Sequence, residues 1–408
     1  MLVRRNILQP EQGPCRGDSS VHGNQKSVSL MALSEVPSAL LLLSTGSMHT
    51  TIPKEFVLVT GSSGLIGART ADRLSAQFRV AGLDRPGEPH PPSSVENIPC
   101  DLSSEDSVVQ ALTMVRERFG VDIAAVVHLA AYFDFSGEPS PKYSEVTVEG
   151  TRRLLRSLHA LGFRVARFIF SSTMLVHKPC EPGEAITEKW PLDPRWPYPQ
   201  SKVETEQVLE SERGQYPTAV LRIAGVYDDA CHSIPLAHHI ERISERHITS
   251  KMFPGHISHG QSFLHLEDLV DAIVRVVERR RTLPETAVML LGEPEPLAYD
   301  ELQHRFGRLL HGEEWDTVRI PKIVAKTGAW IQGVTPLLED PFIKPWMIDF
   351  ADDHYALDVS RAKEWLDWEP RHSLRDTLPK MIDALKRNPV AWYRAHQLSP
   401  PAELEETQ

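Results

Sequence analysis

Two side chains with acid–base chemistry lie close together in the stretch WPYPQSKVE, residues 196–204. Tyr198 precedes Lys202 by four residues, which is about one helical turn, so both side chains are expected on one face of a helix. Pro199 suits the first turn of that helix, where a missing N–H group costs nothing. A phenol with a pKa of about 10 is a poor base at neutral pH, but a nearby ammonium group lowers that pKa. The pair therefore predicts proton transfer with a substrate hydroxyl, although the same spacing also occurs on ordinary surface helices.

Three glycines, Gly61, Gly64 and Gly67, are spaced as in a phosphate-binding turn, between an apolar run and a helical pattern. One glycine allows the tight turn, one lets the backbone approach a pyrophosphate, and one permits close packing of helix on strand. The free N–H groups of the helix N-terminus attract phosphate. Asp84 ends the next apolar run, where a carboxylate accepts hydrogen bonds from a ribose and repels a 2′-phosphate. The pattern favours NAD over NADP, although Arg85 weakens this preference.

Apolar runs alternate with helical patterns from about residue 55 onward. The expected strands are 56–60, 78–84, 122–131, 165–173 and 217–227, and the expected helices between them are 65–77, 101–120 and 144–162. Ser103 followed by Asp106 predicts the cap of the second helix, and Gly120 predicts its end. This alternation predicts an α/β fold with a mainly parallel sheet covered by helices on both faces.

The composition divides the chain into four expected regions. Residues 1–53 are polar and lack periodicity, so we expect an N-terminal extension that is disordered or not part of the fold, with a natural start near Met48. Residues 54–230 are the expected cofactor-binding domain. Residues 231–390, where the alternation loosens, are expected to form a smaller mixed cap that binds substrate and interleaves with the last strands. Residues 391–408 are expected to be a C-terminal tail.

Charge and cysteine usage exclude several classes of function. The net charge is −11 without a long basic run, which argues against nucleic-acid binding. The four cysteines have no C-x-x-C spacing, which argues against a zinc site or a disulfide framework and indicates a reducing compartment, so we expect a cytoplasmic protein. The longest aliphatic run, 39–43, is too short to span a membrane. Scattered histidines without companion ligands at helical spacing predict no metal site. They are His232, His238, His239, His256, His259 and His265.

Beyond the G-x-x-G-x-x-G spacing, six stretches follow one another in an order that resembles the extended short-chain dehydrogenase/reductase family, also called the NAD-dependent epimerase/dehydratase family. They are CDLSS at 100–104, HLAA at 128–131, FIFSST at 168–173, the Tyr198–Lys202 pair, SFLHLEDLVDAI at 262–273 and DVSRAKEWLDWEPRHSL at 358–374. The resemblance covers roughly residues 55–390. It implies a Rossmann-type doubly wound parallel sheet with a smaller mixed C-terminal cap domain.

The resemblance also implies roles for individual residues. Thr173, with Ser172 as the near alternative, holds the substrate oxygen, and Tyr198 and Lys202 move the proton while hydride passes between the substrate and NAD. The residues implied to bind NAD are Gly61, Ser63, Gly64, Leu65, Ile66, Gly67, Asp84, Arg85, Asp101, Leu102, Leu129, Ala130, Ala131, Ser171, Tyr198, Lys202 and Ile223. His265 matches a structural histidine. Family members are often dimers, which implies a homodimer built here from helices at 144–161 and 199–213.

Departures from the family pattern bear on the substrate. Met174 and Leu175 follow Thr173 where dehydratases usually carry an Asp–Glu pair, so a 4,6-dehydratase is disfavoured. Gln261-Ser262 replaces the Arg-Asp that commonly helps nucleotide-sugar enzymes to hold a diphosphate, and Gly225 and Thr147 replace asparagines. Arg242 and Arg246 are candidate substitutes for the missing arginine.

Three functions therefore stay open. The apolar stretches 133–137 and 321–338 favour the branch similar to 3β-hydroxysteroid dehydrogenases, with an apolar alcohol or ketone as substrate, although the stripe around Trp330 also fits plain core packing. A nucleotide-sugar epimerase with recycled NAD is the alternative. A non-catalytic NAD-binding regulatory protein is the third hypothesis, and the intact set of Thr173, Tyr198 and Lys202 argues against it.

Overall fold

The computed structural model describes residues 55–85, 94–134, 137–327 and 343–405. Contacts between Cα atoms separate the chain into two units, Met1–Ile52 and Pro53–Gln408. All described residues belong to the second unit, and the expected N-terminal extension lies outside them. The boundaries predicted within the second unit, 54–230 and 231–390, stay a prediction.

One eight-stranded sheet forms the centre of the described unit. Its strands are β1 (Phe56–Thr60), β2 (Arg79–Asp84), β3 (Glu96–Pro99), β4 (Asp122–His128), β5 (Arg164–Val165), β6 (Phe168–Thr173), β7 (Thr218–Ile223) and β12 (Thr286–Leu291). They lie in the order β12-β7-β6-β4-β1-β2-β3, with β5 beside β4, and every pair is parallel. Because the chain leaves β1 toward β2 on one side and returns to β4 on the other, the order reverses beside β1, which is where such sheets bind ligands.

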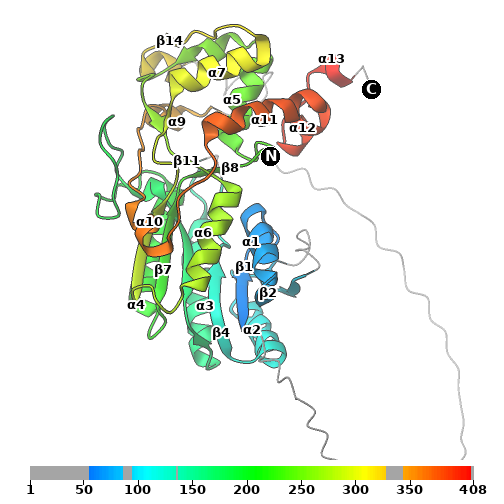
Figure 1. The fold of residues 1–408 in the computed structure, drawn as a ribbon, viewed down its shortest axis with the longest axis vertical. Coiled ribbons are helices and arrows are strands. Elements are labelled where there is room, and N and C mark those ends of the chain that lie inside the picture. The colour runs from blue at the N-terminus through cyan, green and yellow to red at the C-terminus, as the bar shows by residue number, and fades with distance from the viewer. Residues whose placement is uncertain (1–54, 86–93, 135–136, 328–342, 406–408) are drawn as a thin grey trace, which may run out of the picture. The chain divides into compact units, whose positions relative to one another are not determined.

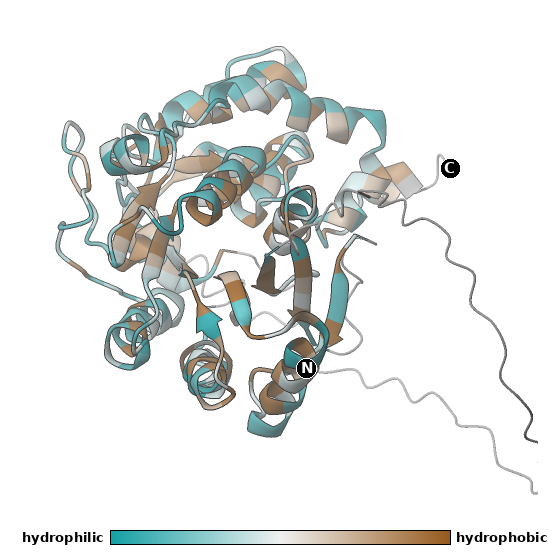
Figure 2. Cartoon of the chain, turned by 60° about the horizontal axis from the view of Figure 1, so that its bottom comes forward, coloured by the Kyte–Doolittle hydropathy of each residue, from teal (hydrophilic) through white to brown (hydrophobic). Residues whose placement is uncertain are grey.

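Helices cover both faces of this sheet. Side chains along each strand point alternately to the two faces, so each face carries apolar side chains that a layer of helices buries. The sheet helices are α1 (Leu65–Ser75), α2 (Glu105–Phe119), α3 (Glu149–Ala160), α4 (Pro197–Glu212), α6 (Leu266–Glu278) and α10 (Ser360–Leu366). Val57 and Val59 join the core beneath α1, α6 and α10, whereas Phe56 and Leu58 join the core beneath α2, α3 and α4. Figure 2 shows the hydrophobic strands between helices with hydrophilic outer surfaces. The predicted doubly wound α/β fold is confirmed.

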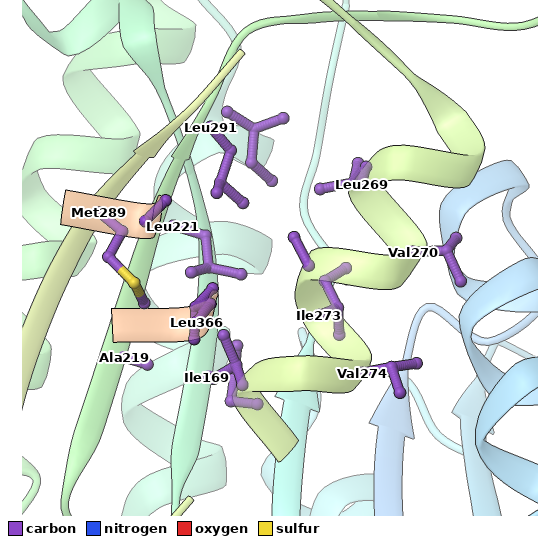
Figure 3. Close-up of a cluster of buried hydrophobic side chains, with 14 of the residues drawn as sticks. Ile169, Ala219, Leu221, Leu269, Val270, Ile273, Val274, Met289, Leu291 and Leu366 are labelled. Atoms are coloured by element: carbon purple, nitrogen blue, oxygen red, sulfur yellow. The ribbon is translucent and has the colours of Figure 1, made fainter. Parts of the chain in front are cut away.

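Helix α6 shows how the first of these cores is packed (Figure 3). Leu269 and Ile273 point toward the strand side chains, among them Leu221 of β7, while Val270 and Val274 point toward α1. Leu366 of α10 closes the cluster on the strand side. This packing holds the helix whose first turn lies beside the carboxyl ends of the strands.

A second group of elements gathers beyond the carboxyl ends of the strands (Figure 1). Its helices and short strands are β8 (Gly225–Tyr227), α5 (Ile234–Ser244), β9 (Met252–Phe253), β10 (Gly260–Gln261), β11 (Phe263–His265), β13 (Leu297–Ala298), α7 (Tyr299–His311), β14 (Val318–Arg319), α9 (Pro345–Phe350), α11 (Leu374–Arg387), α12 (Pro389–Ala395) and α13 (Ala402–Glu405). We call these elements the cap. Its core includes Leu236, Phe306 and Leu378, and also Trp392 and Tyr393 from the segment expected to be a tail.

Local details differ from the sequence expectations. Ser104, not Ser103, caps α2 by accepting a hydrogen bond from the Ser107 N–H, because Ser103 is engaged with the Asp101 carboxylate. The expected strand 217–227 breaks at Ala224 into β7 and β8, and β8 pairs with β11 instead of joining the sheet. The helix expected from 144 starts as a π-helical segment, Tyr143–Val148, before α3. Two short 3₁₀ segments, Met174–Val176 and Ile248–Lys251, complete the list.

Candidate functional site

In the glycine turn between β1 and α1, two glycines have no room for a side chain and the third has room. Gly61 has φ +71°, and a Cβ there would lie 2.9 Å from the Ala130 backbone nitrogen. A Cβ on Gly67 would lie 1.9 Å from the Gly61 carbonyl oxygen, so only glycine allows α1 to start this close to the turn. At Gly64 the nearest atom would be 3.4 Å away, and this glycine precedes the first residue of α1. The space beside Gly64 is what a phosphate group approaching the helix N-terminus requires.

Asp84 at the end of β2 braces this turn. One carboxylate oxygen accepts a hydrogen bond from the Ser63 N–H at 2.8 Å, and the other accepts one from the Arg85 N–H at 2.8 Å. Asp101 lies after β3 and accepts two hydrogen bonds from Ser103, which lower the pKa of its carboxyl group. Both carboxylates therefore lie at the ends of neighbouring strands on the same edge of the sheet, which is compatible with the NAD-binding roles predicted for Asp84 and Asp101.

A buried histidine that the sequence reasoning did not single out joins the two strands at the reversal point. His128, at the end of β4, lies 2.7 Å from the Thr60 hydroxyl and 2.8 Å from the Thr151 hydroxyl. The Thr60 hydroxyl also accepts a hydrogen bond from the Ala130 N–H at 3.2 Å. Burial lowers the pKa of His128 to about 3, so this histidine is neutral. It fixes the backbone at 129–131, where the predicted cofactor residues Leu129, Ala130 and Ala131 lie.

The donor groups around the turn fit a dinucleotide. The hydroxyl oxygens of Ser62 and Ser63 are buried and have no hydrogen-bond partner among the residues that the structure describes. Ser62 packs against Gly82 of β2, whereas Ser63 is next to Gly64 in the turn. Buried polar groups normally have partners, so the unpaired Ser63 hydroxyl is consistent with a bound group that supplies one. Leu65 and Ile66 open the first turn of α1, and Leu102 lies buried next to Asp101. When bound there, NAD would be held by this turn and by the strand ends around it.

Tyr198 and Thr173 meet at the carboxyl end of β6. Tyr198 lies in the first turn of α4, which has Trp196 as its N-cap and Pro197 as its first residue. Thr173 ends β6, is 5% exposed, and its hydroxyl accepts a hydrogen bond from the Leu175 N–H at 3.3 Å and lowers the pKa of the nearby Tyr198 phenol. Burial raises the pKa of Tyr198 to about 12. The expected lowering of this pKa depends on Lys202 and a positively charged nicotinamide ring together, and it stays a prediction. In the chain by itself, loss of hydration outweighs the effect of Thr173.

Lys202 lies one turn further along α4 and is 2% exposed. Its Nζ atom donates a hydrogen bond to the Ser171 carbonyl at 2.7 Å and lies 4.9 Å from the centre of the Phe170 ring. Burial lowers the pKa of Lys202 to about 7, against the attraction of Glu206, which raises it. The lysine is thus anchored to β6 beside Tyr198 and titrates near neutral pH.

Geometry separates Thr173 from Ser172, the alternative catalytic hydroxyl. Successive residues of a strand point to opposite faces. Thr173 reaches Tyr198, whereas the Ser172 hydroxyl donates a hydrogen bond of 2.5 Å to Glu206. Ile223, a predicted cofactor contact, is the neighbour of Thr173 on β7 and is 5% exposed. The structure thus brings Thr173, Tyr198 and Lys202 together with Ser171 and Ile223 at one end of β6 and β7.

Aromatic rings surround the exposed side of Tyr198. The Phe133 ring lies edge-on to the Tyr198 ring with centroids 4.8 Å apart, and the Trp196 ring lies 5.4 Å away. Trp346 of α9 reaches Trp196 at 5.3 Å between ring centres. Arg195 forms an ion pair with Asp353 and lies 4.5 Å from the Phe350 ring centre. The sequence reasoning did not single out Trp346; the apolar stretch it considered centres on Trp330, which lies outside the described residues.

A cavity of about 290 Å³ lies within the cap. Its lining is largely apolar and includes Leu236, Phe253, Phe263 and Met347, together with Arg242 and Gln261. Gln261 lines this cavity, but its neighbour Ser262 does not. The Ser262 hydroxyl is buried and donates a hydrogen bond to the Glu293 carbonyl at 2.7 Å. A Cβ on Gly225 would lie 3.1 Å from the Phe263 ring, so the glycine makes room for that aromatic side chain.

The histidines have structural contacts in the cap. His265 caps α6 by accepting a hydrogen bond from the Glu267 N–H, and its ring stacks on His372 at 4.1 Å. Within the ranges that the structure describes, no group of three or more histidine, cysteine or acidic side chains has an arrangement that could hold a metal ion. No helix in the same ranges is long and apolar enough to cross a membrane.

Comparison with known proteins gives relatives that cover most of the chain. The human 3β-hydroxysteroid dehydrogenase type 7 is 25% identical over 351 residues, which cover 80% of this chain and 94% of that protein. The UDP-glucose 4-epimerase of Mycolicibacterium smegmatis is 28% identical over 338 residues, which cover 80% of this chain and 97% of that protein.

Solved structures share the fold. A dTDP-glucose 4,6-dehydratase from Streptomyces venezuelae, with NAD and TYD bound, superposes with a TM-score of 0.63 at 20% identity and covers 84% of this chain and 99% of that one. The profile of the NAD dependent epimerase/dehydratase family matches residues 57–292, which include the glycine turn, Asp84, Thr173, Tyr198 and Lys202. The chain belongs to the NAD-dependent epimerase/dehydratase family.

Proposed function

We propose that this protein moves hydride between NAD and the carbon of a secondary alcohol or ketone, with Thr173, Tyr198 and Lys202 as its catalytic set. One observation carries the proposal: the Thr173 side chain interacts with Tyr198 at the end of β6, while Lys202 is anchored to the Ser171 carbonyl on the same strand. The glycine turn and the strand ends that would hold NAD lie at the same edge of the sheet.

The chemistry divides between proton and hydride. In oxidation, Tyr198 as phenolate takes the proton of the substrate hydroxyl, the C–H bond breaks, and a C=O bond forms. Bound NAD would supply the hydride acceptor and a positively charged ring that favours the phenolate. In reduction, the neutral phenol donates its proton to the carbonyl oxygen, and the raised pKa of Tyr198 suits it to this direction. Thr173 holds the oxygen at a fixed distance from Tyr198 in both directions.

We propose an alcohol or ketone with an apolar body as the substrate. The rings of Phe133, Trp196 and Trp346 border the approach to Tyr198, and the cap cavity is largely apolar. Sites for apolar ligands have such linings, with a few polar groups that fix orientation. The 25% identity with a 3β-hydroxysteroid dehydrogenase supports this choice. Met174 and Leu175 follow Thr173, so the chain lacks the acid–base pair that dehydration would need at this place.

A nucleotide-sugar epimerase that recycles its NAD is the second candidate. It is favoured by Arg242 in the lining of the cap cavity and by the identity with a UDP-glucose 4-epimerase. Arginine is the side chain best suited to hold a diphosphate. Epimerisation would leave no net NADH, because the hydride returns to the same carbon.

We also propose a homodimer that uses α3 and α4. These two helices contact each other on one face of the sheet, and Glu212 of α4 is paired with Arg152 and Arg156 of α3. A joint surface of two helices per subunit is what the family resemblance implies. Light scattering should give twice the chain mass, and a monomer at micromolar concentration would contradict this part of the proposal.

Two assays separate the candidate functions. The purified protein and NAD are mixed with a panel of aliphatic, aromatic and steroid-like secondary alcohols, and NADH is followed by its absorbance. In parallel, UDP- and GDP-sugars are incubated without added reductant and separated by chromatography. NADH from an apolar alcohol supports the first proposal, and conversion of a sugar nucleotide without net NADH supports the second. Tyr198→Phe should lower whichever activity is found by about 10²-fold or more; a panel in which it keeps full activity would overturn both.

A further inference from the structure

We infer that Glu206 is a positioning residue for the catalytic set: it ties the strand that ends in Thr173 to the helix that carries Tyr198 and Lys202, and it holds negative charge beside Lys202. This inference rests on the proposed function. Glu206 lies on α4 one turn beyond Lys202, and its side chain is 13% exposed. It matches none of the predicted cofactor contacts, and its side chain accepts hydrogen bonds from Ser172 and Arg222.

The Glu206 carboxylate connects three elements. One oxygen accepts hydrogen bonds from the Ser172 hydroxyl at 2.5 Å and from Arg222 Nε at 3.2 Å. The other accepts one from Arg222 Nη2 at 2.6 Å. Ser172 and Arg222 are register partners on the neighbouring strands β6 and β7. A bidentate carboxylate–guanidinium pair has a narrow range of geometries, so this contact sets the distance between α4 and the two strands.

The remaining donor nitrogen of Arg222 is also satisfied. Its Nη1 atom donates to the Glu188 carbonyl at 3.1 Å and lies 3.0 Å from His177 Nε2. His177 Nδ1 lies 3.0 Å from the Trp190 carbonyl, so the proton is on Nδ1 and Nε2 accepts from Arg222. Burial and Arg222 lower the pKa of His177 to about 4, which keeps this ring neutral. Glu206 therefore supplies the only carboxylate among the described partners of Arg222, whose side chain is 8% exposed.

Position and charge both follow from this network. Ser172 precedes Thr173, so a shift of the Ser172 contact moves the hydroxyl that interacts with Tyr198. Glu206 also raises the pKa of Lys202 against the effect of burial. The other titratable groups that face Lys202 are Tyr198 on its own helix, whose phenol is neutral, and His128 from β4, which is neutral at physiological pH. Arg222 from β7 faces Glu206. Tyr143 from the π-helical segment faces Tyr198. Glu206 thus opposes the effect of burial on the Lys202 ammonium group.

The charge arm of the test does not require a substrate. In protein labelled with [ε-¹³C]lysine, the Lys202 resonance is identified by its absence in Lys202→Met and then titrated. In Glu206→Gln the pKa of Lys202 should fall by about one unit, the low end of what a nearby opposite charge contributes. Glu204→Gln is the matched control, because it removes the same charge from an exposed position two residues earlier on α4. An unchanged Lys202 pKa in a folded Glu206→Gln protein would overturn the charge role.

The position arm uses Ser172→Ala, which removes one hydrogen bond and keeps every charge. With the best alcohol from the panel above, kcat should fall about 10-fold while the alkaline limb of its pH profile stays in place. Glu206→Gln should lower kcat and also move the alkaline limb of the pH profile to lower pH. Glu206→Asp should return that limb to its wild-type pH but leave kcat low. If Glu206→Gln does not fold, Ser172→Ala and Glu206→Asp still decide the matter. Wild-type kcat in Ser172→Ala would overturn the positioning role. Full activity of Tyr198→Phe would instead defeat the proposed function itself.

Discussion

The Nζ atom of Lys202 lies 5.6 Å from the centre of the Tyr198 ring, and both side chains come from the first two turns of α4. Burial acts on both groups in the direction of their neutral forms, raising the pKa of Tyr198 to about 12 and lowering that of Lys202 to about 7. A buried pair with this bias does not form a phenolate without further positive charge. In the chain alone, Tyr198 is therefore protonated and can donate its proton. Once a cation is bound beside it, Tyr198 can lose that proton and accept one from a substrate hydroxyl.

Tyr198→Phe should lower turnover by about 10²-fold to 10⁴-fold, because it removes the group that exchanges the proton and leaves the ring in place. NAD affinity should stay nearly unchanged, since the substitution leaves the glycine turn and Asp84 intact. The measurement is kcat together with NAD binding by calorimetry. Loss of NAD binding in parallel with turnover would mean that Tyr198 holds the cofactor rather than the proton.

Asp84→Asn should weaken NAD binding about 10-fold and narrow the preference for NAD over NADP. The substitution keeps the size of the side chain but removes the charge that repels a 2′-phosphate. It also weakens the acceptor of the Ser63 and Arg85 N–H groups, and hydrogen bonds to charged groups are worth about 1.5 to 3 kcal/mol each. The ratio of kcat/KM for the two cofactors tests this. An unchanged ratio would contradict the assignment of Asp84 to the ribose.

The parts of the site that sequence reasoning could predict are those encoded by neighbouring residues. A glycine turn, an acidic residue at a strand end and a Tyr-x-x-x-Lys pair each lie within a few positions of one another. The structure places Gly61, Gly64 and Gly67 around one turn, and Tyr198 with Lys202 on one helix. Strand β3 was missed because Glu96–Pro99 is a short polar edge strand, without the apolar run that marks buried strands.

The parts that could not be predicted depend on contacts between distant segments. Trp346 meets Trp196, and Glu206 meets Arg222, only because the cap and β7 fold back against α4. No local pattern marks either pair, since each residue alone reads as core or surface. The choice of Thr173 over Ser172 had the same limit: the alternation of a strand says that they face opposite ways, and only the packed structure says which one faces Tyr198.

Gly64→Ala and Gly67→Ala should have opposite consequences. A Cβ on Gly67 would lie 1.9 Å from the Gly61 carbonyl oxygen, so Gly67→Ala should destabilise the turn and lower the melting temperature. A Cβ on Gly64 has its nearest neighbour at 3.4 Å, so Gly64→Ala should fold normally and lose NAD affinity because the methyl group occupies phosphate space. Thermal unfolding and calorimetric NAD binding, measured on both variants, test the pair. Normal NAD affinity in Gly64→Ala would place the phosphates elsewhere.

Glu293→Gln should change how stability depends on pH. Glu293 is 7% exposed, and its two oxygens accept hydrogen bonds from the Tyr227 hydroxyl at 2.7 Å and the Leu374 N–H at 2.9 Å. Burial raises the pKa of its carboxyl group from 4.5 to about 7. The folded state therefore binds more protons than the unfolded state between these values, and this group's contribution to stability is present below pH ~4.5 and lost as pH rises through ~7.

The loss amounts to roughly 3 kcal/mol above pH ~7 for a shift of this size. Urea unfolding at pH 5 and pH 8 should show the wild type losing stability relative to Glu293→Gln, which has no carboxyl group to ionise at this position. Glu295→Gln, an exposed position two residues further along, should follow the wild-type pH dependence. Parallel curves for the wild type and Glu293→Gln would mean that Glu293 ionises in the folded state as readily as in the unfolded chain. In that case the contacts of Glu293 with Tyr227 of β8 and with Leu374 of α11 would not depend on pH.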